Sequence, residues 1–137
     1  MAWSDSTLLL YAIAVAAVSI YFPYLFVAYA RFRVGYDLSA PRAMFDKLPP
    51  YAQRAMWAHQ NAFETFVTFL AAGLVAYVTG VSSPWASSAA VVFMVARWLY
   101  SAFYILDLPL LRSTAFIIGS FATATLFALG LLSATLA

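Results

Sequence analysis

Four long apolar runs constrain this chain more than any other feature of its sequence. They cover roughly residues 8–29, 51–79, 84–106 and 109–136. Each run reaches the ~20 apolar residues that span the hydrocarbon core of a bilayer. Lipid offers the backbone no hydrogen bonds, so only helices and closed barrels can cross it, and a barrel would show short segments of alternating apolar and polar residues. The unbroken runs therefore predict an all-α integral membrane protein, built as a four-helix bundle.

The sequence outside the four runs leaves no room for a soluble domain. The 137 residues are 66% hydrophobic and only 9% charged, which is too apolar to cover a water-facing surface. We expect one domain over residues 1–137, with a single hydrophilic loop at about residues 30–50. The chain has no cysteine, which excludes disulfides, thiolate metal ligands and a thiol nucleophile of its own. We expect no metal site, and any function must lie in the helices or the first loop.

The positive charges are concentrated at the first loop. The seven cations are Arg31, Arg33, Arg42, Lys47, Arg54, Arg97 and Arg112. Five of them lie within or beside the loop, so the positive-inside rule places the loop in the cytoplasm and, with four spans, both termini on the opposite side. These cations could equally serve only to set orientation and to contact the phosphates of membrane lipids. No basic patch with interleaved aromatic residues suggests a nucleic acid partner.

Four side chains in the second and third runs are costly in hydrocarbon: His59, Asn61, Glu64 and Arg97. A charge in mid-membrane costs several kcal/mol unless it is paired or hydrated, so such residues suggest a functional site. Residues three, four and seven apart share a helix face. One such stripe holds Arg54, Trp57, Asn61, Glu64 and Thr68, and another holds Arg97, Tyr100 and Tyr104. Two inward stripes at similar depth predict a pocket for a polar, anionic molecule, although a structural ion pair between Glu64 and Arg97 would also explain them.

Two further features each allow two interpretations. His59 lies about 200° around the helix from Asn61, so it points elsewhere, as a core or interface histidine or as a catalytic base. Arg112 and Ser113 open the fourth run just after Pro109. A helix N-terminus carries partial positive charge and free N–H groups, so this pair suits an anion such as a thiolate. A snorkelling arginine beside a capping serine is the alternative.

The stretch from Arg54 to Thr65 resembles the second-helix signature of the MAPEG family, membrane-associated proteins in eicosanoid and glutathione metabolism. The spacing His59-x-Asn61-x-x-Glu64 carries most of the resemblance. It extends over the whole chain and is nearest to the prostaglandin E synthase and glutathione transferase branch at Arg112 and Ser113. The resemblance implies a homotrimer that binds glutathione between subunits near the cytoplasmic side.

The resemblance also implies roles for individual residues. The positions that match glutathione-binding or sulfur-activating positions of the family are Arg31, Asn61, Glu64, Tyr104, Arg112 and Ser113. In that scheme Arg112 stabilises the glutathione thiolate, Ser113 donates a hydrogen bond nearby, and Glu64 receives the amino group of the tripeptide. A cationic donor favours the charged form of a thiol. From their stripes, Arg54, Arg97 and Tyr100 are candidates for the same site.

Some positions depart from the family pattern. Trp57 and Gln60 stand where glutathione-using relatives of this branch carry arginines, Tyr100 replaces a histidine, and Phe116 replaces a tyrosine. The sequence thus predicts a glutathione-dependent membrane transferase or peroxidase that acts on a lipophilic electrophile or peroxide. The alternative is a non-catalytic lipid-binding adaptor or accessory subunit of the same fold. A channel or transporter is a third option, but the sequence shows no inverted repeat and no broken mid-membrane helix. Pro23 is expected to kink the first helix, but no polar segment is available to partner it.

Overall fold

The computed structural model describes residues 4–136, so residues 1–3 and 137 at the ends of the expected domain lie outside the description. Within the described chain the regular elements are helices: α1 Asp5–Ser19, α2 Phe22–Val34, the 3-10 helix η1 Pro41–Lys47, α3 Pro50–Val78, α4 Pro84–Ile105 and α5 Pro109–Leu136. Four stretches are long and apolar enough to cross a membrane, namely Asp5–Val34 and the helices α3, α4 and α5. The predicted all-α membrane fold is confirmed.

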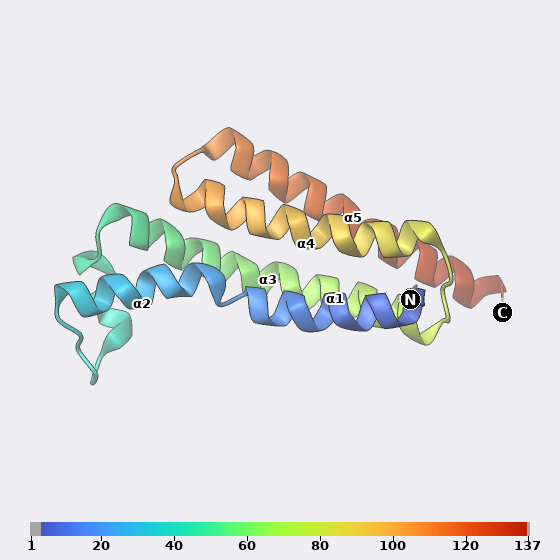
Figure 1. The fold of residues 1–137 in the computed structure, drawn as a ribbon, viewed down its shortest axis with the longest axis horizontal. Coiled ribbons are helices and arrows are strands. Elements are labelled where there is room, and N and C mark those ends of the chain that lie inside the picture. Colours follow the sequence, from blue (N-terminus) through green and yellow to red (C-terminus); the bar gives the residue numbers. More distant parts are fainter. Residues whose placement is uncertain (1–3, 137) are drawn as a thin grey trace.

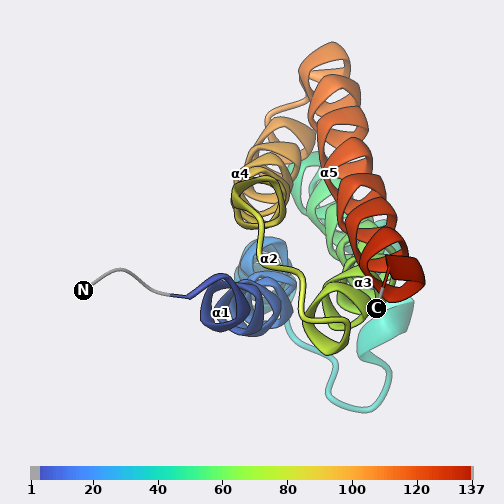
Figure 2. The ribbon, with the colours of Figure 1, turned by 90° about the vertical axis from the view of Figure 1, so that its right-hand side faces the viewer.

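The helices run side by side along one axis (Figure 1). Helices α1 and α2 follow one another almost in line and together make the first span, while α3, α4 and α5 alternate in direction. The view along the bundle shows α4 and α5 on one side and α1, α2 and α3 on the other (Figure 2). The described ends of the chain lie at one end of the bundle, and η1 lies at the other.

Proline marks the start of each later span. Helices α3, α4 and α5 begin with Pro50, Pro84 and Pro109. Proline suits the first helical position because its fixed φ is already helical and its missing N–H would have no partner there. The side chain of Ser83 accepts a hydrogen bond from the backbone N–H of Trp85 and caps α4. The sequence therefore defines these helix starts locally.

The first span differs from the single helix expected at residues 8–29. It begins earlier, ends later at Val34, and breaks between α1 and α2. Pro23 explains the break, because proline has no N–H to donate and its ring clashes with the carbonyl four residues earlier. The carbonyl of Ile20, at the break, accepts a hydrogen bond from Nδ1 of His59 at 2.8 Å. Arg31 and Arg33, expected in the loop, belong to the last turn of α2.

Small residues hold the end of the bundle that carries the termini. A Cβ added to Gly130 would lie 2.7 Å from Cγ1 of Val75 and 3.0 Å from the backbone nitrogen of Ala76, so α5 and α3 touch there. The rings of Phe69 and Phe93 stack with centroids 3.8 Å apart. This close contact sets the spacing of α3, α4 and α5, from which the candidate site is built.

Candidate functional site

The centre of the site is a hydrogen-bonded series of three side chains from α3 and α4. Nη2 of Arg97 donates to Oδ1 of Asn61 at 2.9 Å, and Nδ2 of Asn61 donates to Oε2 of Glu64 at 3.3 Å. At 1.5 Å per residue, Asn61 lies roughly 16 Å from the start of α3 and Glu64 roughly 21 Å. Asn61 and Arg97 thus meet at the depth and on the faces predicted from the sequence.

Glu64 and Arg97 do not pair directly. The one salt bridge among residues 4–136 joins Arg54 to Asp107, and Asn61 stands between Glu64 and Arg97 as an amide bridge. The alternative of a simple structural ion pair is therefore wrong in its geometry. An amide can accept from a guanidinium and donate to a carboxylate at once, so Asn61 links the two charges while leaving the carboxylate at the surface of the chain.

Aromatic rings continue this series toward the start of α5. The guanidinium carbon of Arg97 lies 4.1 Å from the ring centroid of Tyr100, and that of Arg112 lies 4.6 Å from the ring centroid of Tyr104. The two tyrosine rings lie 5.6 Å apart, edge to face. A cation over an aromatic face is attracted by the ring's negative charge density. We call the set Glu64, Asn61, Arg97, Tyr100, Tyr104 and Arg112 the polar track.

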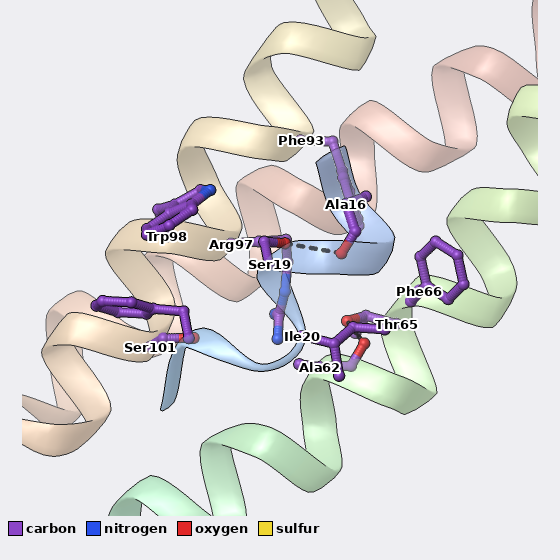
Figure 3. A pocket seen from close by; sticks show the side chains of 11 residues that line it. Ala16, Ser19, Ile20, Ala62, Thr65, Phe66, Phe93, Arg97, Trp98 and Ser101 are labelled. Atoms are coloured by element: carbon purple, nitrogen blue, oxygen red, sulfur yellow. Dashed lines mark hydrogen bonds between the residues drawn. The ribbon is translucent and has the colours of Figure 1, made fainter. Parts of the chain in front are cut away.

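Arg97 is the most deeply enclosed charge of the polar track. Its residue is 7% exposed, and its Nη1 is buried without a hydrogen-bond partner in the described chain. Two small cavities adjoin it. One, shown in Figure 3, lies at the break between α1 and α2 and has a volume of about 10 Å³, which is the size of one water. The other, of about 120 Å³, lies between α3, α4 and α5.

The second cavity is lined by hydroxyl groups as well as by Arg97. Thr65, Thr68, Ser120 and Thr123 all line it. Each of these hydroxyls donates to a backbone carbonyl of its own helix. Their remaining lone pairs can only accept. The cavity therefore combines the side chain of Arg97 with several acceptor oxygens, which suits water or a polar ligand group.

Arg54 is engaged elsewhere. Its Nε and Nη2 donate to the carbonyl of Ile105 at 3.2 and 3.1 Å, and its Nη1 lies 3.7 Å from Oδ2 of Asp107. It therefore caps the C-terminal end of α4, next to the outer end of the polar track at Tyr104. Arg54 does not join the polar track, because its donors are taken by Ile105 and Asp107. Ser113 does not join it either, because it is exposed and its hydroxyl makes no hydrogen bond within residues 4–136.

His59 lies on a different face of α3 from Asn61, and Arg31 belongs to the neighbouring helix α2. Nη1 of Arg31 donates to the hydroxyl of Tyr24 at 3.1 Å, and the Tyr24 and His59 rings lie 5.0 Å apart. Within one chain, Arg31 is thus not brought to the polar track. The sequence did not reveal this second polar region, since its members come from α2, η1 and α3 and follow no single helical stripe. The available signal in the sequence was an arginine, Arg31, directly after the first apolar run.

No group of three or more His, Asp or Glu residues in the described part of the chain is placed to hold a metal ion. The site's chemistry comes from guanidinium, amide, carboxylate and phenol groups. Together, fold and site define an α-helical membrane protein. Its spans bring ionisable side chains together inside the bundle, toward the end that carries η1.

The comparison with known families identifies the class more closely. The family model described as MAPEG family matches residues 8–132, and the chain belongs to this family. The family is a membrane four-helix bundle, and it includes both glutathione-dependent enzymes and members without catalytic activity. No curated protein and no solved structure matches the chain.

Proposed function

We propose that the protein is a glutathione-dependent membrane enzyme, a transferase or peroxidase of the prostaglandin E synthase and glutathione transferase branch. Its acceptor would be a lipophilic electrophile or peroxide that enters from the bilayer. The observation that carries the proposal is the hydrogen-bonded series Glu64–Asn61–Arg97, held inside the spans at the inner end of a track that leads to Arg112. The chain has no cysteine, so glutathione would supply the thiol that serves as nucleophile or reductant.

The charges of the polar track fit the tripeptide. Glutathione carries one ammonium and two carboxylates besides its thiol. The unpartnered Nη1 of Arg97 calls for an acceptor such as a carboxylate, since a buried donor without a partner is costly. Glu64 would receive the ammonium, and Asn61 would keep both charges in place. Tyr100 and Tyr104 would complete the binding residues with their rings and hydroxyls.

Arg112 and Ser113 are the proposed catalytic residues. They are the fourth and fifth residues of α5, close to the helix end whose dipole favours a negative charge. Arg112 is held over the ring of Tyr104, so its position is defined. Its cation would favour the thiolate over the thiol, and the exposed Ser113 hydroxyl would donate a hydrogen bond beside it.

The exposure of Glu64 supports an assembly. In a single chain its side chain is exposed, although it lies roughly 21 Å along α3. A carboxylate facing hydrocarbon at that depth would cost several kcal/mol. A homotrimer, as the family resemblance implies, would cover this face with a neighbouring subunit and enclose the ligand between them. We further propose that the η1 end, which holds most of the cations, faces the cytoplasm and the termini face the opposite side.

A second candidate is a non-catalytic lipid-binding adaptor, and Trp57 favours it. The ring of Trp57 lies 5.6 Å from Phe45 and 6.3 Å from Tyr104, at the mouth of the polar track. An indole at this position gives an apolar ligand a large contact area. It binds a carboxylate less well than an arginine would, because it lacks the guanidinium's charge and paired donors.

The deciding experiment uses detergent-purified protein. We expect glutathione-dependent turnover of a lipophilic electrophile, reduced by at least about 100-fold in Arg112→Ala, because removing one preorganised cationic donor costs that much at comparable sites. Thermal unfolding and assembly size should stay unchanged. Arg33→Ala is the matched control, since Arg33 is exposed and outside the track.

Turnover that persists in Arg112→Ala would remove Arg112 from the mechanism. Calorimetry separates the two candidates, because an adaptor would show no binding at millimolar glutathione.

A further inference from the structure

The smaller of the two cavities beside Arg97 lies inside the bundle, at the break between α1 and α2. Its volume is about 10 Å³, which is room for one water molecule. The break contributes Ser19 and Ile20 to its lining, α3 contributes Thr65, and α4 contributes Arg97 and Ser101. Figure 3 shows the side chain of Arg97 among these residues. The cavity thus joins three spans within a single chain.

Ser101 brings an unused hydroxyl to this cavity. The residue is 4% exposed, and its hydroxyl makes no hydrogen bond within residues 4–136. Thr65, which also lines the cavity, donates instead to the carbonyl of Asn61 in its own helix, as such side chains can do. A buried hydroxyl without a partner is costly. Ser101 therefore has both a donor and an acceptor free for a molecule in the cavity.

Arg97 supplies the charge at this cavity. A guanidinium has several N–H donors, and within residues 4–136 Arg97 uses one of them, for its bond to Asn61. The residue is 7% exposed, so its other N–H groups are enclosed by the protein. A buried charge is expensive unless it finds partners. None of the residues that line the cavity, all within the described chain, is acidic. A neutral acceptor of small volume would satisfy the guanidinium on this side.

The break in the first span supplies acceptors. In an unbroken helix the carbonyl of Ser19 would accept from the N–H of residue 23, but Pro23 has no N–H. The hydroxyl of Ser19 donates to the carbonyl of Ala16 at 2.8 Å, a bond drawn in Figure 3, so its remaining lone pairs can only accept. Donors on α4 thus face acceptors at the break. Water both accepts and donates, whereas a halide can only accept and a metal ion can only be coordinated.

We infer that this cavity binds one ordered water, which accepts from Arg97 and bonds to Ser101 and to the acceptors of the break. That number of partners is typical of a buried water. Ser101 is then a positioning residue, because through the water it holds the guanidinium that binds Asn61. The water itself is independent of glutathione. Its effect on glutathione binding rests on the proposed function, in which Arg97 holds a carboxylate of the tripeptide.

The water is tested by X-ray radiolytic labelling of the purified full-length protein in detergent. Short X-ray pulses convert bound water to hydroxyl radicals, which oxidise the side chains beside it. Ile20 lines the cavity and is 4% exposed, whereas Leu9 is 1% exposed and does not line it. We expect Ile20 to be oxidised and Leu9 to be spared.

A matched pair of variants tests the role of Ser101. Ser101→Thr keeps the hydroxyl, and Ser101→Val has the same shape without it. Ser101→Val should lose the labelling of Ile20 and raise KM for glutathione by about fivefold with kcat nearly unchanged, because Arg97 contributes to binding and not to thiolate formation. Ser101→Thr should keep both properties. Thr125→Val is the control, since the Thr125 hydroxyl is bonded within α5 and lines neither cavity.

The result that would overturn the water is equal oxidation of Ile20 and Leu9, or unchanged labelling of Ile20 in Ser101→Val. Equal KM values in the Thr and Val variants, or an equal rise in Thr125→Val, would remove Ser101 as a positioning residue. If the added methyl unfolded both variants, Ser101→Ala would take their place and should raise KM in the same way. A protein without glutathione turnover would contradict the proposed function, and the labelling of Ile20 would still decide the water.

Discussion

The two ends of the bundle are built from different residues. At the end that carries the termini, Gly130 lets α5 meet the backbone of α3, and nearer the middle of the bundle Phe69 stacks on Phe93. Toward the η1 end α3 and α4 are joined by polar side chains, as at Asn61 and Arg97, beside a smaller apolar cluster that α2 and α3 form with Leu48. Small residues allow close helix contact in lipid, where no hydrophobic force drives helices together. One end therefore fixes the helix spacing, and the other can hold side chains that lipid would reject.

The largest expected effect tests the polar end. Asn61→Leu keeps the side chain's size but leaves the Arg97 guanidinium and the Glu64 carboxylate without their bridge. We expect a loss of about 3 kcal/mol in the free energy of unfolding in mixed micelles. The double variant Asn61→Leu/Arg97→Met should lose less than Asn61→Leu alone, because it removes the unpaired charge as well. Equal losses would mean that Arg97 does not depend on Asn61.

A pair of substitutions on α5 tests the packed end. Gly130→Ala would place a methyl 2.7 Å from Val75 and 3.0 Å from the backbone of Ala76, so we expect a loss of about 2 kcal/mol. Gly119→Ala is the matched control, since its nearest contacts are ordinary at 3.7 Å. It should be neutral or stabilising by up to about 1 kcal/mol, because alanine is the better helix former. If both variants behaved alike, α3 and α5 would not be in close contact.

A smaller loss of stability is expected for the contact between Arg54 of α3 and the end of α4. Arg54→Ala removes two hydrogen bonds to the Ile105 carbonyl. We expect a loss of about 1 kcal/mol, together with little change in glutathione binding, because these donors already have partners. Weaker binding by tenfold or more in calorimetry would instead place Arg54 among the ligand contacts.

The smallest effect is expected for the ion pair beside that cap. The Asp107 side chain is 69% exposed, and exposed pairs contribute little. Asp107→Asn should change stability by less than about 0.5 kcal/mol, and asparagine tolerates the positive φ of 61° at this turn. A change as large as that in Arg54→Ala would show that the ion pair, and not the carbonyl cap, holds α3 to α4.

Helical periodicity explains what could be predicted from the sequence. Asn61 and Arg97 share a depth and face one another because apolar length fixes the depth and the 3.6-residue repeat fixes the face. The same reasoning made the direct Glu64–Arg97 pair an open alternative, since spacing along a helix does not say which of two neighbouring polar groups takes the bond. An amide side chain can both donate and accept hydrogen bonds, so its partners depend on side-chain geometry that the sequence does not give.

Contacts that join distant segments could not be predicted in this way. Arg54 binds a carbonyl 51 positions along the chain, and His59 binds the carbonyl exposed by the break before Pro23. Backbone carbonyls leave no mark in the sequence, so such partners become visible only in the fold. Arg31 was assigned with the glutathione residues by resemblance, yet within its own chain it lines a pocket away from the polar track.

The most direct test of the account is the ultraviolet absorbance of the glutathione thiolate on the purified assembly at neutral pH. We predict a thiolate signal above that of free glutathione in the unaltered protein and in Arg33→Ala, and none in Arg112→Ala. Saturating glutathione without any thiolate signal, or the same signal in Arg112→Ala, would contradict the claim that the polar track and Arg112 form one thiol-binding site.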